Sequence, residues 1–318
     1  MSSIAMGPGG EFDRIRAIAD ALGDSAADLG DDTAQVPEAD GTLIVSNDAC
    51  VEGVHYKPGW IHDEEIGWRA AAGALSDLAA AGAMPVGLLV GVTVPSDATN
   101  ARLVEVMRGV GAMARSVGTA VRGGNLSDGP VLSLTTTVLG RARRPVSRAG
   151  ARPGDGVWVS GVLGGPRAAL LAWLDGRQPA PAARTAFARP QPRLRLGAWL
   201  AAKGVTAMMD ISDGLAGDAP HLAAASAARL EIDLAALPVH PSVHAEARRR
   251  DEPAPVLAAV GGEEYELLFT MPAAFDDAAA AEAGGGVPIT RVGRVVDGAG
   301  VRFALGEQEF ELEGFRHR

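Results

Sequence analysis

The chain has 318 residues, of which 47 % are hydrophobic and 21 % charged, and its formal net charge is −10 at pH 7. This length suits two domains, and the composition is typical of a soluble globular protein. The acidic balance argues against nucleic acid and anionic membranes as partners, because both bind basic patches. Cys50 is the only cysteine, and no long apolar run or signal-peptide pattern is present, so we expect a cytoplasmic protein without a membrane segment.

The first half of the chain alternates predicted helices and strands. Apolar residues at helical spacing, or alanine-rich sequence that starts at acidic residues and stops at glycine or proline, predict helices over 11–22, 63–84 and 97–117. Apolar runs rich in valine, leucine and threonine predict strands over 42–48, 86–95 and 131–140.

Residues 141–156 are rich in arginine, proline and glycine and lack apolar periodicity, so we place the domain boundary there and expect domains at 1–145 and 146–318. Predicted elements of the second half are strands over 157–161, 205–210 and 264–270 and helices over 165–175, 193–203 and from about 213. The glycines of 281–288 predict a flexible turn. Each half is therefore expected to be an α/β or α+β layer structure.

Candidate chemistry rests on aspartates, because the glycine-lysine phosphate loop, the dinucleotide-binding glycines and the common hydrolase motifs are all absent. Asp31 and Asp32 stand side by side, where the simplest interpretation is a solvated turn. Asp48 ends a predicted strand, at the edge where ligands usually bind. Asp77 lies in an alanine-rich helix, either on a solvated stripe or buried beside a cation or hydrogen-bond donors.

Two more aspartates occur in DISDGL, where Asp210 ends a predicted strand and Asp213 is placed to cap the next helix. An ordinary capping pair explains these two residues equally well on their own. Taken together, the aspartates predict a site for a hard cation such as Mg²⁺, which takes oxygen ligands. Phosphate beside several carboxylates needs such an ion, since like charges about 4 Å apart repel by about 4 kcal/mol at an effective dielectric of about 20. The pattern favours metal-assisted phosphoryl transfer.

Nine motifs occur in order along nearly the whole chain. They are GEFDRI (10–15), GDDTAQV (30–36), DACVEGVHY (48–56), LSDLAAAGAMP (75–85), GGNLSDGP (123–130), SRAGARPGD (147–155), RPQPR (189–193), DISDGL (210–215) and GGEEYELLFT (261–270). Together they resemble the thiamine-monophosphate kinase family. The resemblance implies the α/β (α+β), two-domain fold of aminoimidazole-ribonucleotide-synthetase-like proteins, with the N-terminal domain dimerising through its sheet.

The resemblance also implies ATP-dependent phosphorylation of thiamine monophosphate to thiamine diphosphate, by direct in-line transfer with several Mg²⁺ ions in a homodimer. The implied metal ligands are Asp32, Ser46, Asn47, Asp48, Asp77, Asn125, Asp210 and Asp213, of which Asp210 and Asp213 are the candidate catalytic residues. The implied ATP contacts are Gly124, Asn125, Arg148 and Ser212, and the implied thiamine monophosphate contacts are His55, Glu263 and Phe315. Without the resemblance, an exposed linker arginine, a strand-end histidine, a strand-start glutamate and a core phenylalanine are ordinary interpretations of Arg148, His55, Glu263 and Phe315.

Several positions depart from the residues usual in that family. Asn125 replaces an aspartate, Asn47 replaces a threonine, and Glu264 replaces an aspartate. Asn125 favours an alternative in which the chain is a non-catalytic paralogue that binds ATP or a thiamine phosphate, and another kinase or synthetase of the same superfamily is a further alternative. Selenophosphate synthetases and the hydrogenase-maturation relative are disfavoured, since no cysteine precedes Cys50 and none ends the chain.

Overall fold

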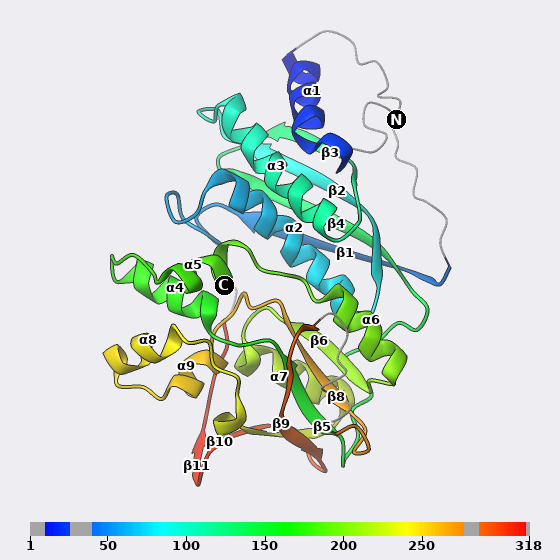
Figure 1. Cartoon of the computed structure of the whole chain (residues 1–318), viewed down its shortest axis with the longest axis vertical. Coiled ribbons are helices and arrows are strands. Elements are labelled where there is room, and N and C mark those ends of the chain that lie inside the picture. Colours follow the sequence, from blue (N-terminus) through cyan, green and yellow to red (C-terminus); the bar gives the residue numbers. More distant parts are fainter. Residues whose placement is uncertain (1–9, 26–39, 277–285, 316–318) are drawn as a thin grey trace. The chain divides into compact units, whose positions relative to one another are not determined.

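The computed structural model describes residues 10–25, 40–276 and 286–315 (Figure 1). These residues divide into two compact units. The first comprises residues up to Leu78 together with Met84–Arg143, and the second comprises Ala79–Ala83 together with the chain from Arg144 onward. Each unit combines one β-sheet with helices.

The first unit contains a four-stranded sheet of order β1-β4-β2-β3, in which β2 and β3 run parallel and the other pairs antiparallel. Its elements are α1 (Gly10–Leu22), β1 (Thr42–Val51), α2 (Asp63–Ala80), β2 (Met84–Val94), α3 (Asn100–Ser116), β3 (Val121–Asp128) and β4 (Ser133–Ala142), with a 3₁₀ turn, η1 (Gly23–Ser25), after α1. Strands β1 and β3 form the two edges of the sheet.

The two faces of this sheet differ in burial. Helices α2 and α3 lie along one face (Figure 1), and Cys50, on the same face of β1 as Ser46 and Asp48, is buried there. The other face carries exposed apolar side chains, since Leu43 and Val45 of β1 are 44 % and 56 % exposed and Met84 of β2 is 40 % exposed. Within the described part of the chain, this second face has no helix of the first unit packed over it.

The second unit is built on a seven-stranded sheet of order β11-β10-β7-β9-β5-β8-β6, mostly antiparallel. Its strands are β5 (Gly156–Ser160), β6 (Ala207–Ile211), β7 (Arg229–Asp233), β8 (Glu266–Met271), β9 (Ile289–Val296), β10 (Gly300–Leu305) and β11 (Gln308–Phe310). Its helices are α4 (Gly165–Leu174), α5 (Pro181–Ala188), α6 (Leu194–Lys203), α7 (Leu215–Ser226), the 3₁₀ turn η2 (Leu234–Ala236), α8 (Val243–Arg250) and α9 (Ala254–Ala259).

Helix α7 packs against β6, β7 and β10. Leu230 and Ile232 of β7 and Phe303 of β10 are buried, whereas Glu231 and Arg302, which alternate with them, lie on the opposite face. This alternation is the burial pattern of a sheet covered on one side. The charged side of β7 and β10 is therefore turned away from α7.

A buried ion pair fixes the beginning of β8. Arg193, at the end of the RPQPR motif, donates from Nε to Glu266 Oε2 at 2.7 Å and from its Nη2 to the other carboxylate oxygen. Ser160 at the end of β5 donates to the same carboxylate, and its hydroxyl accepts the amide of Leu267. Removing one partner from such a pair would leave a buried charge, which is costly.

Most predicted elements are found within a few residues of their expected bounds. The helix expected over 63–84 ends at Ala80, because Gly82 takes a left-handed conformation with φ of +67° and stops it. Sequence periodicity missed the short elements β3, α5, α8 and α9 and the strands β7, β9, β10 and β11. The predicted turn at 281–288 falls mainly outside the described residues. No described helix is both long and apolar enough to cross a membrane.

Candidate functional site

In the first unit, Ser46 and Asp77 form a polar pair between β1 and α2. The Ser46 hydroxyl donates to Asp77 Oδ2 at 2.5 Å. Asp48 follows two residues later on the same face of β1, and its Oδ1 accepts the amide of Ala49 at 2.8 Å. These three predicted ligands thus supply oxygen atoms along one end of β1 and the neighbouring helix.

Asn47 and Asn125 are placed elsewhere. Asn47 points to the uncovered face of the sheet, where its Nδ2 donates to Thr137 Oγ1 at 2.7 Å. Asn125 lies on the edge strand β3, in register with Gly91 of β2, and that row continues through β4 to Ala49 of β1. Because strands are about 4.8 Å apart, three strand spacings separate Asn125 from β1 by roughly 14 Å. Within one chain, the structure does not bring either asparagine together with Ser46 and Asp48.

Gly124 has a structural role besides the predicted ATP contact. A Cβ at this position would lie 1.9 Å from the carbonyl oxygen of Val90, its partner in the parallel pair of β2 and β3. No side chain fits in this space, so β3 can reach β2 only with glycine here. The backbone of β3 around Gly124 is exposed and open to a ligand.

His55 lies in a tight turn that follows β1. Its Nδ1 accepts the amide of Val51 at 3.0 Å, and its own amide donates to the Val51 carbonyl at 3.0 Å. A neutral imidazole that accepts at Nδ1 carries its proton on Nε2. His55 is therefore fixed as a donor at Nε2, which suits an anionic group of a ligand.

In the second unit, the DISDGL motif forms the turn from β6 into α7. Asp210 is buried near the end of β6, and the amides of Ser212 and Asp213 both donate to Asp218 Oδ2 at 3.0 Å. The expectation that Asp213 caps the helix is wrong, because α7 begins at Leu215 with Gly214 as its N-cap and no side-chain cap. Asp218, one turn into the helix, satisfies the amides of the preceding loop instead.

The three aspartates of this turn affect each other electrostatically. Burial, then the charge of Asp210, then that of Asp213, raise the pKa of the Asp218 carboxyl to about 8, against the lowering effect of its two backbone hydrogen bonds. Carboxylates gathered in this way provide the oxygen donors that a divalent cation takes. Their chemistry fits Mg²⁺, the metal ion that the sequence resemblance implies.

The loop before β8 packs directly on this turn. The amide of Glu263 donates to Ser212 O at 2.6 Å, and that of Tyr265 donates to Ile211 O at 2.9 Å. Glu263 and Tyr265 both adopt left-handed backbone conformations, with φ of 67° and 53°. Such conformations are unfavourable for residues other than glycine and concentrate at functional sites.

Side chains of the same loop are tied down as well. The buried Tyr265 donates its hydroxyl to Glu263 Oε2 at 2.7 Å, which orients that carboxylate. Glu264 Oε1 accepts the amide of Gly164 at 2.6 Å, at the start of α4. Burial raises the pKa of Glu264 well above the ordinary value, although the Gly164 hydrogen bond opposes this effect. Glu264, which replaces the aspartate usual in that family, thus has a specific backbone partner in Gly164.

The last described residues complete this group. The amide of Phe315 donates to Asp213 O at 3.0 Å, and its side chain is 55 % exposed. Phe315 is therefore not a core residue. Arg148 has an exposed side chain, and its carbonyl accepts the Ser226 hydroxyl at 3.1 Å. Asp32 and its neighbour Asp31 lie outside the described residues.

Among the described residues, no three side chains of histidine, cysteine, aspartate or glutamate are arranged to hold a metal ion by themselves. Magnesium does not require such a cage, because it commonly binds one or two carboxylates and completes its shell with water and substrate phosphates. The donor groups described here, Ser46 with Asp77 and the turn at Asp210, are consistent with that mode of binding.

Comparison with known proteins identifies the family to which this chain belongs. Two family models match this chain: AIR synthase related protein, N-terminal domain, over residues 30–142, and AIR synthase related protein, C-terminal domain, over residues 152–306. A thiamine-monophosphate kinase of Aquifex aeolicus is 33 % identical over 316 residues, which cover 97 % of this chain and 98 % of the relative. The chain belongs to the thiamine-monophosphate kinase family.

Solved structures of the thiamine-monophosphate kinase family share the fold. The enzyme of Stenotrophomonas maltophilia K279a has a TM-score of 0.80 and 34 % identity, covering 94 % of this chain and 97 % of its own. A structure described as AaThiL complexed with AMPPCP and TMP also has a TM-score of 0.80, with 32 % identity, and covers 99 % of this chain and 100 % of its own. The expected two-domain α/β fold and the family resemblance are confirmed.

Two residues of the described site were missed in the sequence. Asp218 stands five residues after Asp213, in the first turn of a helix, where acidic residues are so common that the position carried no signal. Tyr265 alternates with strand residues, so its sequence context indicated only packing. Its hydrogen bond to Glu263 depends on the two left-handed residues, which sequence periodicity does not reveal.

Replacing Gly124 with alanine should destabilise the first unit, because the new methyl group would collide with the Val90 carbonyl at the junction of β2 and β3. We expect a loss of about 1–3 kcal/mol of unfolding free energy, as for other overpacked sites, measured by urea denaturation. Gly91→Ala is the matched control, since a Cβ there meets nothing closer than 3.8 Å. Equal stability of the two variants would contradict this account of Gly124.

Proposed function

We propose that this chain transfers the γ-phosphoryl group of ATP to thiamine monophosphate, giving ADP and thiamine diphosphate. In this reaction a phosphate oxygen of thiamine monophosphate forms the new bond to the γ-phosphorus, and the bond from that phosphorus to the bridging oxygen of ADP breaks. Support comes from membership of the family and from the relative named as complexed with AMPPCP and TMP. The structural observation that carries the proposal is the strained loop 261–265 fixed on the aspartate turn at 210–213.

We assign Mg²⁺ to two groups of oxygen donors, Ser46, Asp48 and Asp77 in the first unit and Asp210 and Asp213 in the second. When bound, Mg²⁺ would neutralise the phosphoryl oxygens and so lower the repulsion between two anionic substrates. The remaining ligand predictions, Asp32, Asn47 and Asn125, stay predictions.

The chain's own residues would hold the substrates by charge. The Nε2 proton of His55 suits the phosphate of thiamine monophosphate, and the oriented Glu263 carboxylate suits the positively charged thiazolium ring. The exposed ring of Phe315 suits the same cation, because aromatic faces attract positive charge. Arg148, Ser212 and the open backbone at Gly124 would contact ATP, with Arg148 able to bind phosphate through two donors.

We also propose that the chain forms a homodimer through the uncovered face of the first unit's sheet. Leu43, Val45 and Met84 expose apolar surface there, and neighbouring rows of the sheet place them on one face.

The kinase proposal predicts ADP and thiamine diphosphate only when ATP, Mg²⁺ and thiamine monophosphate are all present, as measured by chromatography of the products. Asp210→Asn should lower kcat by at least about 100-fold while the circular dichroism spectrum is retained, since a metal ligand loses its charge. Asp297→Asn, at an exposed turn after β9, is the control and should be fully active. Binding of AMPPCP without turnover would contradict the proposal and favour the non-catalytic paralogue.

Tyr265→Phe should raise KM for thiamine monophosphate about tenfold, with KM for ATP unchanged and kcat within about twofold. The reason is that Glu263 loses the hydroxyl that orients it. A tenfold change corresponds to about 1.4 kcal/mol, close to the lower limit of about 1.5 kcal/mol for a hydrogen bond to a charged group. Tyr56→Phe is a matched control, because the buried Tyr56 hydroxyl has no hydrogen-bond partner in the described structure. An unaltered KM in Tyr265→Phe would remove Tyr265 from the substrate site.

The dimer proposal predicts a mass in solution twice that of the 32.5 kDa chain, measured by light scattering on a sizing column. Val45→Glu should shift the protein towards the monomer, because it buries a charge in the proposed apolar contact. Leu174→Glu, at a comparably exposed position of α4, should leave the mass unchanged. A wild-type protein that elutes as a monomer at micromolar concentration would refute the proposal.

A further inference from the structure

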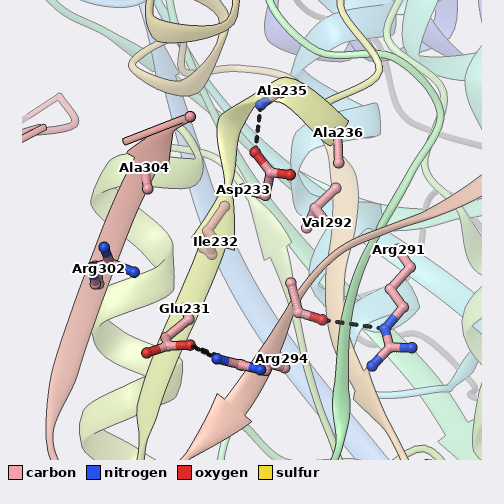
Figure 2. A pocket seen from close by; sticks show the side chains of 12 residues that line it. Glu231, Ile232, Asp233, Ala235, Ala236, Arg291, Val292, Arg294, Arg302 and Ala304 are labelled. Carbon is pink, nitrogen blue, oxygen red and sulfur yellow. Dashed lines mark hydrogen bonds and ion pairs between the residues drawn. The ribbon is translucent and has the colours of Figure 1, made fainter. Parts of the chain in front are cut away.

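The second unit carries a pocket that the proposed reaction does not use. It has a volume of about 540 Å³ and opens on the face of β7, β9 and β10 that is turned away from α7 (Figure 2). This volume lies within the range of small-molecule sites. We call it the arginine pocket, after three of its lining residues: Arg291, Arg294 and Arg302.

A β-bulge brings two of these arginines to the same pocket. In a regular strand, residues three apart point to opposite faces. In β9, however, Trp158 pairs with Arg291 and the adjacent Val157 pairs with Gly293, so Val292 is an extra residue. Val292 and Val295 are consequently both buried, whereas Arg291 and Arg294 are both exposed and both line the pocket.

Small residues keep the pocket open. Its lining includes Ala235, Ala236, Ala304, Gly293 and Gly306. Gly293 is required by the close approach of β9 to β7, since a Cβ there would lie 2.0 Å from the carbonyl oxygen of Glu231. The hollow is thus a consequence of sequence and of strand packing.

The acidic residues of the pocket already have partners. Glu231 is bonded to Arg294 at 2.7 Å, and Asp233 accepts the amide of Ala235 at 2.9 Å at the start of η2, as Figure 2 shows. Arg302 pairs with Glu309 of β11 at 2.7 Å, and that glutamate does not line the pocket. Arg294 and Arg302 are thus each paired with a carboxylate, whereas Arg291 forms no ion pair among the described residues.

Arg291 has the largest unused capacity for binding. In the described part of the chain its guanidinium makes one hydrogen bond, a long one of 3.4 Å from Nε to the Gly293 carbonyl. An arginine side chain has five N–H donors in a planar fork, which matches the oxygens of phosphate. Figure 2 shows the Arg291 side chain to the right of the Glu231–Arg294 pair, with its hydrogen bond to the Gly293 carbonyl drawn as a dashed line.

We propose that the arginine pocket binds a small molecule that carries a phosphate or diphosphate group. Arg291 is the principal anchor, Arg294 and Arg302 add further N–H donors beside their ion pairs, and the alanines and glycines leave room for the rest of the molecule. A diphosphate fits better than a single carboxylate, because several guanidinium groups can share its charge. This site is separate in sequence and in position on its unit from the turn at 210–213 and the loop at 261–265, and it is independent of the proposed kinase reaction.

Pyrophosphate binding to the full-length protein tests the proposal by ¹H–¹⁵N NMR, without nucleotide, thiamine monophosphate or Mg²⁺. The amides of Gly293, Ala235, Ala236 and Gly306 should shift in a saturable manner, and sodium chloride of equal ionic strength should not reproduce the shifts. Arg291→Gln should weaken this binding at least about fivefold. Arg249→Gln, an exposed arginine on α8, should bind as the wild type does.

Unmoved pocket amides, or equal binding by Arg291→Gln and wild type, would overturn the proposal. Stronger shifts with an oligoglutamate peptide than with pyrophosphate would also overturn it, in favour of an acidic polypeptide partner. Because the readout is residue-specific, pyrophosphate binding at the kinase site moves other amides and cannot be mistaken for the expected result. Arg291→Gln should retain the wild-type rate of thiamine diphosphate formation if the kinase proposal holds, so the two proposals fail separately.

Discussion

The contact between the backbone of residues 261–265 and the turn at 210–213 is the constraint on which the second unit's site depends. The amides of Glu263 and Tyr265 donate hydrogen bonds to the carbonyls of Ser212 and Ile211. Both residues adopt unfavourable left-handed backbone conformations. The surrounding structure holds them there through the Arg193–Glu266 ion pair on one side and the Glu264–Gly164 hydrogen bond on the other. Orientation of the Glu263 carboxylate by Tyr265 follows from this geometry.

Charged side chains are distributed unevenly over the second unit. Carboxylates gather at Asp210, Asp213 and Asp218, where burial, and after it the charges of the other two, raise the pKa of Asp218. Such a set is unfavourable on its own and becomes favourable when a cation is bound. Elsewhere in the second unit, Arg291 of β9 lines a pocket and forms no ion pair among the described residues. The two regions suit ligands of opposite kind, a metal ion in one and an anion in the other.

Much of this could be predicted from the sequence, where a pattern has a single structural explanation. The long amphipathic helices and buried strands were predicted because their periodicity extends over many residues. The short strands β7, β10 and β11 were missed because three to six residues are too few for a period to emerge. Asp210 was identified from its position at a strand end, whereas Asp213 was assigned a capping role that Gly214 makes unnecessary. Only strand register and alternation reveal that Asn125 lies three strands from β1 and that the Asn47 side chain points to the face opposite Ser46.

The extra residue Val292 has a consequence for comparing relatives. A homologue that lacked one residue between Ile289 and Val296 would have a flat, unbulged strand, and one of its two guanidinium groups would be forced into the hydrocarbon interior. Such a deletion would therefore be accompanied by loss of an arginine. The length of this segment therefore distinguishes family members that have the arginine pocket from those that lack it.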